Sequence, residues 1–275
     1  MKKAEKDDDW SQRRIQSIEV GFKVIRAMEA ADGPMPLRDI AAAAGMPPSK
    51  AHLYLVSFIR EGLVRQDPHS GHYGLGAFAI QLGHSAIRQV DIVDLAREEL
   101  GALQQETGFA SYLSLWGNRG PGIVSKVDGH RQGSLAVRLG YVLPLSASAT
   151  GQVFLAWLDR SETRHILADE IQTARHSEEN WTIAPDLARD PDKLDSLIAS
   201  VRERGYATSK NNINANFAAM AAPVFDHSGR IAASVTVLGS DKTMTGTKAK
   251  AVTSVLLETT GRLSRRLGYA PRIKA

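Results

Sequence analysis

The sequence has no cysteine among its 275 residues, few aromatic residues (6%) and no long apolar run free of turn and hydroxyl residues. The lack of cysteine excludes disulfides, thiolate zinc sites and cysteine nucleophiles, and it favours a reducing, cytoplasmic location. The opening segment MKKAEKDDDW is charged and lacks the apolar stretch of a signal peptide. Residues 139–158 are uncharged and long enough to span a membrane, but Pro144 and several hydroxyl residues predict a buried turn and helix instead.

The charges of the sequence are nearly balanced, since 34 Lys and Arg against 30 Asp and Glu leave a net charge of +4. The first 75 residues hold eleven basic and ten acidic residues, whereas residues 242–275 hold eight and one. Bulk charge therefore does not identify a nucleic-acid-binding domain, and such an assignment has to come from the residue pattern.

Signatures of catalysis are also missing. The sequence has no G-x-x-x-x-G-K-[ST], H-E-x-x-H or G-x-S-x-G motif. His69 and His72 have a spacing that suits metal ligands, but no third ligand is near in sequence, so a phosphate contact or plain solvation is the favoured interpretation. We predict no enzyme activity, no catalytic residue, no metal and no cofactor.

Residues 1–10 form a charged tail, and three segments with the residue pattern of helices follow it. Apolar residues recur at helical spacing from Ile15 to Met28, with Ser11 as the expected N-cap. The segment LRDIAAAAG, residues 37–45, predicts a short helix that ends at Gly45. After a tight turn, PPSKAHLYLVSFIREGLV, residues 47–64, predicts a second helix opened by Pro48.

This second helix has two unlike faces. Ala51, Tyr54, Leu55 and Phe58 fall on one side and form the expected core face. The other side and its flanks carry hydroxyls, cations and aliphatics: Ser49, Lys50, His52, Leu53, Val56, Ser57 and Arg60. Such a face suits the major groove, with donors for phosphates and base edges and methyl groups for thymine.

The next segment, GLVRQDPHSGHYGLG, residues 62–76, predicts a two-stranded hairpin with a DPHSG turn. A helix-turn-helix followed by such a wing predicts a winged helix-turn-helix. We expect Ser49, Lys50, His52, Leu53 and Ser57 to face the groove. Arg60, Arg65 and His69 are expected near phosphates.

The C-terminal half mixes helices and strands. Helices are predicted at 91–108, 149–158, 191–204 and about 246–267. ASYLSLW, GIVSKV and SLAVRL predict strands, and AAMAAPVFD with RIAASVTVLG predicts a hairpin. Strands grouped around a few helices indicate an α+β ligand-sensing fold.

Together the two halves resemble the isocitrate-lyase-regulator (IclR) family of transcriptional regulators, over about residues 11–268. The resemblance rests on LRDIAAAAGMPPSKAHLYLVSFIREGLVRQD, YGLGAFAIQLG, LPLSASATGQVFLAWL and RERGYATSKNNINANFAAMAAPVFDHSG. The residues that fit the family signature are Gly205, Ser209, Ala219, Met220, Ala221, Val224, Phe225 and Asp226. The chain departs from the family at Asn212, Asn216 and Leu53, where relatives usually carry Glu, Gly and often Arg.

The resemblance implies a winged helix-turn-helix at 11–75, a linker helix at 76–88 and a GAF-like effector-binding domain at 89–275, assembled as dimers or tetramers. It implies a regulator that binds a double-stranded DNA operator under control of a small molecule. The alternative is an enzyme, or a sensor that does not bind DNA and uses its helix-turn-helix to contact protein.

The expected effector site begins at the loop and helix PLSASATGQVFLAW, residues 144–157. Ser148, Ala149, Thr150 and Gly151 open this helix, and they either only cap it or hold an anion at its free N–H groups. The resemblance adds the position of Ala219 to the pocket, and Met220 and Ser234 are expected in the same cavity. We predict a small organic acid, aromatic or not, with its carboxylate at 148–151.

Overall fold

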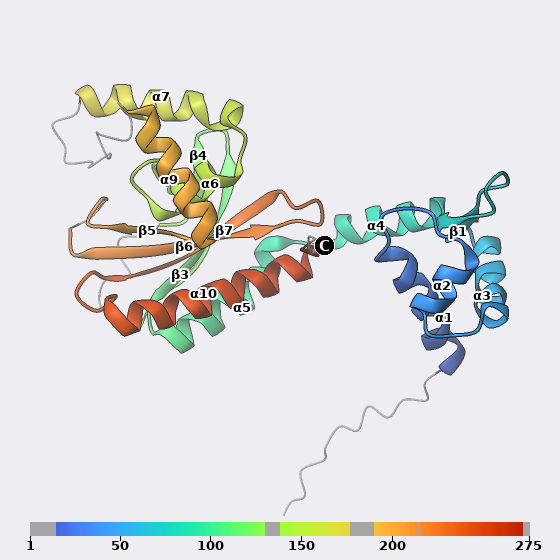
Figure 1. The fold of residues 1–275 in the computed structure, drawn as a ribbon. Helices are drawn as coiled ribbons and strands as arrows, with labels where there is room; N and C mark the ends of the chain where they lie inside the picture. The colour runs from blue at the N-terminus through green and yellow to red at the C-terminus, as the bar shows by residue number, and fades with distance from the viewer. Residues whose placement is uncertain (1–14, 130–137, 177–189, 214, 272–275) are drawn as a thin grey trace, which may run out of the picture. The chain divides into compact units, whose positions relative to one another are not determined.

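The computed structural model describes residues 15–129, 138–176, 190–213 and 215–271, which form two compact units, Met1–Gln89 and Val90–Ala275 (Figure 1). The tail at residues 1–10 and the expected cap at Ser11 lie outside the described residues. No helix in the described ranges is long and apolar enough to cross a membrane.

The described residues of the first unit form three packed helices, a wing and a fourth helix. Its elements are α1 (Gln16–Glu29), α2 (Leu37–Ala43), α3 (Pro48–Arg60), β1 (Val64–Gln66), β2 (Tyr73–Leu75) and α4 (Ala77–Gln89). The core contains Val24 of α1, Ile40 of α2 and Leu55 of α3, all fully buried. β1 and β2 pair antiparallel, and Met35 adds a bridge to Tyr73 on the outer side of β2.

The turn between α2 and α3 follows from local chemistry. Gly45 has a φ of +65°, a conformation that glycine adopts without steric penalty, and it stops α2. Pro48 occupies the first turn of α3, where a missing N–H leaves no hydrogen bond unmade. The predicted helix-turn-helix and wing are confirmed, although α3 ends at Arg60, four residues before the end of the segment 47–64 that predicted it.

The second unit is an α+β domain. Its elements are α5 (Ile92–Thr107), β3 (Ala110–Gly117), β4 (Gly120–Val127), α6 (Ala149–Trp157), α7 (Arg160–His176), α9 (Pro191–Arg204), β5 (Ala207–Lys210), β6 (Phe217–Phe225), β7 (Ile231–Ser240) and α10 (Gly246–Arg266). The strands form an antiparallel sheet in the order β4-β3-β7-β6-β5. The predicted α+β class is confirmed, although α7 was not anticipated, and most of the SLAVRL segment lies outside the described residues.

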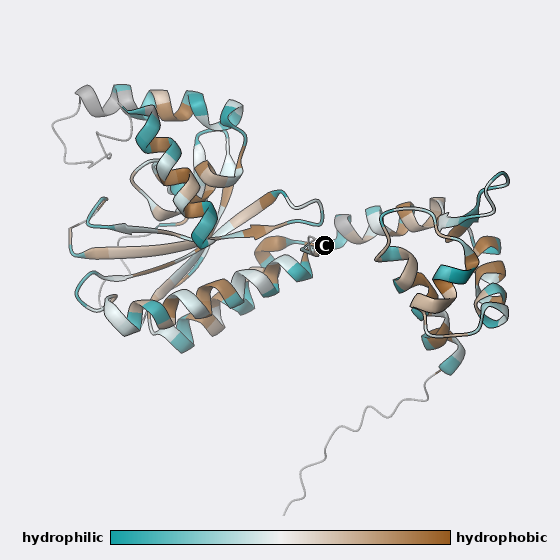
Figure 2. Ribbon diagram, in the orientation of Figure 1, coloured by the Kyte–Doolittle hydropathy of each residue, from teal (hydrophilic) through white to brown (hydrophobic). Residues whose placement is uncertain are grey.

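The sheet is covered on both faces (Figures 1 and 2). α5 and α10 pack on one face, against side chains such as Leu113, Met220 and Val235. α6 and α9 pack on the other, against Ala219 and Ala221. Because side chains alternate along a strand, neighbouring residues of β6 belong to different layers.

α5 starts from a cap of its own. The Asp91 carboxylate accepts hydrogen bonds from the N–H groups of Val93 (2.8 Å) and Asp94 (3.5 Å), whereas α4 ends at Gln89. The two helices are therefore separate, with a short break between them.

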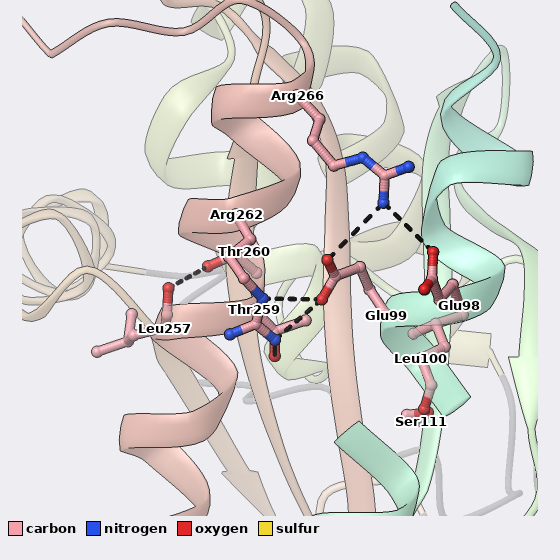
Figure 3. A network of polar contacts seen from close by, with 9 residues as sticks. All are labelled: Glu98, Glu99, Leu100, Ser111, Leu257, Thr259, Thr260, Arg262 and Arg266. Carbon is pink, nitrogen blue, oxygen red and sulfur yellow. Dashed lines mark hydrogen bonds and ion pairs between the residues drawn. The ribbon is translucent and has the colours of Figure 1, made fainter. Parts of the chain in front are cut away.

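An ion-pair network joins α5 to α10 (Figure 3). Nε and Nη2 of Arg262 donate to Oε2 of Glu99 at 3.0 and 2.9 Å. Arg266 lies 3.8 Å from both Glu98 and Glu99. Since the Glu99 side chain is only 12% exposed, its carboxylate depends on these partners more than a surface carboxylate would.

Candidate DNA-binding surface and ligand site

The outer face of α3 is exposed as the sequence predicted, except at Val56, which is partly buried. Ser49, Lys50, His52, Leu53, Ser57 and Arg60 are all exposed. The Leu53 side chain is 69% exposed, whereas Ala51 and Leu55 on the inner face are fully buried. Burial of Leu53 against a partner would remove this apolar surface from water.

The inner face of α3 packs closely against α1. The rings of Tyr54 and Phe58 stack with centroids 6.5 Å apart. A Cβ added to Gly21 of α1 would lie 3.1 Å from both rings, so the glycine permits the close approach of α1 to α3. The outer face is thus presented on a rigid support.

One predicted contact residue has a partner within its own helix. The Ser57 hydroxyl donates to the carbonyl oxygen of Leu53 at 3.1 Å. Its proton is therefore used, and Ser57 offers an outside partner mainly an acceptor.

The wing presents Arg65 and His69, both exposed. The turn between its strands is held by Asp67, whose carboxylate accepts from the backbone N–H groups of Ser70 (2.8 Å) and His69 (2.9 Å). These bonds keep the pKa of Asp67 below its usual range. His69 is thereby held at the tip of an ordered turn.

Within the described ranges, no three His, Cys, Asp or Glu side chains come close enough to hold a metal ion.

At the expected effector site, Ser148 caps α6. Its Oγ accepts from the Gly151 N–H at 2.7 Å and donates to the carbonyl oxygen of Pro144 at 2.6 Å. Ser148 therefore caps the helix, which is one of the two predicted roles. The Gly151 N–H, which was one of the groups predicted to hold an anion, already donates to Ser148.

Gly151 of α6 lies against the backbone of the preceding loop. A Cβ there would lie 2.3 Å from the carbonyl oxygen of Pro144 and 2.4 Å from Cα of Leu145. Gly151 thus makes room for the chain's own backbone.

A cluster of buried hydroxyls lies on the α6 face of the sheet, formed by Tyr112, Ser114, Thr150, Ser234 and Thr236. The hydroxyls of Thr150 and Thr236 are 2.8 Å apart, and that of Tyr112 is 3.5 Å from Thr150. Burial raises the pKa of the Tyr112 phenol. Ser114 Oγ is buried and has no hydrogen-bond partner among the described residues. We name this set the hydroxyl cluster.

The predicted grouping of Ala219, Met220 and Ser234 is wrong for Met220. Ala219 pairs with Ser209 and faces α6, and Ser234 lies on the same side of the sheet. Met220 points to the opposite layer, where its sulfur accepts from the Thr253 hydroxyl at 3.3 Å. Adjacent residues of one strand cannot line one cavity on one face.

Sequence reasoning missed the groups that fix the loop before α6. Glu170 of α7 accepts from the N–H groups of Leu145 and Ser146. The Gln152 amide donates to the carbonyl oxygen of Ser146 at 3.0 Å, and the Asn212 amide donates to that of Ala147 at 3.1 Å. Periodicity does not signal the contacts of Glu170 and Asn212, because these join segments 24 to 65 residues apart in the chain.

Asn212 and Asn216 are the two departures from the family signature in this region. Asn212 makes the bond to Ala147 with its amide N–H, a donor that glutamate would lack. Asn216 has a φ of +69°, in the left-handed region where asparagine is better tolerated than most residues. It therefore serves the backbone conformation that glycine would otherwise provide.

The fold and the exposed face of α3 define the class of protein: a winged-helix DNA-binding protein joined to an α+β unit. Residues 17–68 match the IclR helix-turn-helix domain, and residues 84–265 match the bacterial transcriptional regulator IclR C-terminal domain. The chain belongs to the IclR family of transcriptional regulators.

Individual relatives agree with this assignment. The HTH-type transcriptional regulator XynR of Escherichia coli K12 is 26% identical over 255 residues, which cover 93% of this chain and 98% of XynR. The crystal structure of Pseudomonas aeruginosa HmgR has a TM-score of 0.83 and 31% identity, covering 94% and 100% of the two chains. An IclR homologue from Microbacterium hydrocarbonoxydans, complexed with 4-hydroxybenzoate, has a TM-score of 0.53 and 18% identity, covering 91% and 98%. That last likeness is one of fold alone.

Proposed function

We propose that the chain regulates transcription by inserting α3 into the major groove of its operator, in response to a small organic acid bound in the second unit. The observation that carries the DNA-binding part is the exposed outer face of α3, where Leu53 stands among Ser49, Lys50 and His52 on a rigid support. Lys50 supplies a donor for phosphates or guanine, and Leu53 supplies methyl groups for thymine.

Replacement of Leu53 by glutamate tests this part. The carboxylate would meet the phosphate-lined groove, and a lost base-edge contact alone costs about 1–3 kcal/mol. We expect Leu53→Glu to weaken binding to DNA from upstream of the chain's own gene at least about tenfold in gel shifts. Leu53→Arg should instead change the preferred sequence.

Leu139→Glu is the matched control, because Leu139 is 60% exposed but belongs to the second unit. It should leave the gel shift unchanged. Normal operator binding by folded Leu53→Glu would show that α3 does not read DNA, and would favour a role for the helix-turn-helix in contacting protein.

We propose further that two or more copies bind DNA together. Ile15, Ile18 and Phe22 on α1, and Ile80 and Leu82 on α4, are each at least half exposed. A second copy would cover these residues, and two linked heads would raise affinity through effective concentration. Ile80→Lys should shift the protein toward monomer in sedimentation and weaken operator binding. A wild-type monomer at micromolar concentration that binds operator tightly would contradict the proposal.

The effector is proposed to bind beside the hydroxyl cluster, on the α6 face of the sheet. Thr150, Thr236 and Ser114 offer buried hydroxyls on that face, and Ser114 Oγ has no hydrogen-bond partner among the described residues. A small organic acid, such as the 4-hydroxybenzoate bound by the homologue, has the size and polar groups for such a site. Calorimetry with organic acids should show weaker binding to Thr150→Val than to wild type. Equal affinity in both would move the site elsewhere.

A further inference from the structure

The loop before α6 contains three donors that converge on one carboxylate. The N–H groups of Leu145 and Ser146 follow each other in the chain, and both donate to Glu170. The Ser146 hydroxyl also approaches Glu170. We call these three donors the carboxylate grip. Successive backbone N–H groups that point the same way form an anion site.

Glu170 engages the three donors unevenly, since its Oε1 lies 2.5 Å from the Leu145 N–H. Both donors of Ser146 lie 3.4 Å from Oε2 of Glu170, whereas charge-assisted hydrogen bonds are usually about 2.7–2.9 Å long. Glu170 is fixed to α7, so its carboxylate cannot move freely to satisfy all three donors. A carboxylate on an untethered molecule has no such restriction.

The charge of Glu170 is also poorly compensated. No Lys or Arg of the described residues forms an ion pair with it, and burial raises its pKa despite the hydrogen bonds. α7 itself is anchored by little buried surface. Of its side chains that the structure describes, only Thr163 and Ile166 are buried.

We propose that the carboxylate grip is a binding site for the carboxylate of a small organic acid, and that Glu170 occupies it when the acid is absent. The proposal deepens the effector function proposed above and rests on it. Leu145, Leu155 and Ile166 pack together next to the grip, so its surroundings are apolar.

Acetate tests the grip, because its size matches the atoms removed by Glu170→Ala. The variant should melt about 3–8 °C below wild type, since buried donors lose a charged acceptor. Acetate should restore much of this loss, whereas chloride at the same ionic strength and acetamide, which is neutral and of similar shape, should not. Wild type should respond less, because acetate must first displace the tethered Glu170 carboxylate from the grip.

Asp169→Ala is the control, because Asp169 precedes Glu170 on α7 but is exposed. Acetate should not raise its melting temperature selectively. If Glu170→Ala is unfolded in chloride, recovery of native tryptophan fluorescence on refolding in acetate against acetamide decides the same point. An acetate response equal to that of acetamide, or equal in wild type and Glu170→Ala, overturns the proposal. Gel shifts with wild type report operator binding separately, so failure of the grip would leave the DNA-binding function standing.

Discussion

Two Gly→Ala substitutions in helices of the second unit should change stability in opposite directions. Alanine is favoured over glycine inside a helix by about 1 kcal/mol, so propensity alone predicts a gain at both positions. At Gly101 of α5 a Cβ would meet no atom within 4 Å, and the gain should appear. At Gly151 of α6 the Cβ would lie 2.3 Å from the carbonyl oxygen of Pro144, about 1 Å inside normal contact distance.

The clash at Gly151 cannot be relieved by a side-chain rotation, because the atoms it meets are backbone. The loop that holds them is tied by the hydrogen bonds from Gln152 and Asn212. Overpacking of this kind costs about 1–3 kcal/mol and more where the backbone is fixed, so we expect Gly151→Ala to lose about 2–4 kcal/mol. For a unit of this size, that lowers the melting temperature by about 5–15 °C.

Thermal unfolding followed by tryptophan fluorescence measures both variants. Gly101→Ala should melt about 2–4 °C above wild type, and Gly151→Ala well below it. If both variants melt above wild type, the loop yields at little cost and the explanation of Gly151 is refuted. Because of this clash, Thr150→Val is the better probe of effector binding, since a change at Gly151 would disturb the fold itself.

Three further outcomes follow from contacts in the second unit. Arg262→Leu should cost about 1–3 kcal/mol in denaturant unfolding, because it leaves the Glu99 carboxylate without its main partner, whereas Arg97→Leu, which breaks an exposed pair, should cost less than about 0.5 kcal/mol. Asn216→Gly should match or exceed the melting temperature of wild type, and Asn216→Val should lower stability by about 1–2 kcal/mol because of its positive φ. The raised pKa of Glu170 means that wild type should gain stability relative to Glu170→Ala as the pH falls from that raised value toward the ordinary 4.5, and a pH-independent difference between them would contradict this.

The helices and strands of the two units could be predicted from the sequence to different extents. α3 could be predicted in detail, because burial follows helical periodicity: Ala51 and Leu55 are buried, and Leu53 is exposed. The strands of the second unit were also found, because β6 and β7 are long apolar runs separated by a turn. α7 was not predicted from the sequence, because most of its residues are polar or charged. Few buried residues among those described, including Thr163 and Ile166, mark its inner face.

The candidate ligand site was foreseen only in part. Ser148 and Thr150 were located through the cap of α6, a local signal. The assignment of Met220 failed because the sequence does not state which face of β6 meets α6. Tyr112, Ser114 and Thr236 were missed because their meeting depends on the register of β3 with β7, which no single segment encodes. The predicted DNA contacts and effector contacts remain predictions.

The separate cap of α5 has a consequence for how such proteins diversify. Because Asp91 nucleates α5 locally, that helix does not need α4 to template its start. Recombination at residues 90–91 would therefore join the DNA-binding unit of another protein to the second unit of this chain without breaking a helix on either side. New pairings of operator and signal could arise in one genetic step, and an engineer building hybrid biosensors would cut the chain at the same place.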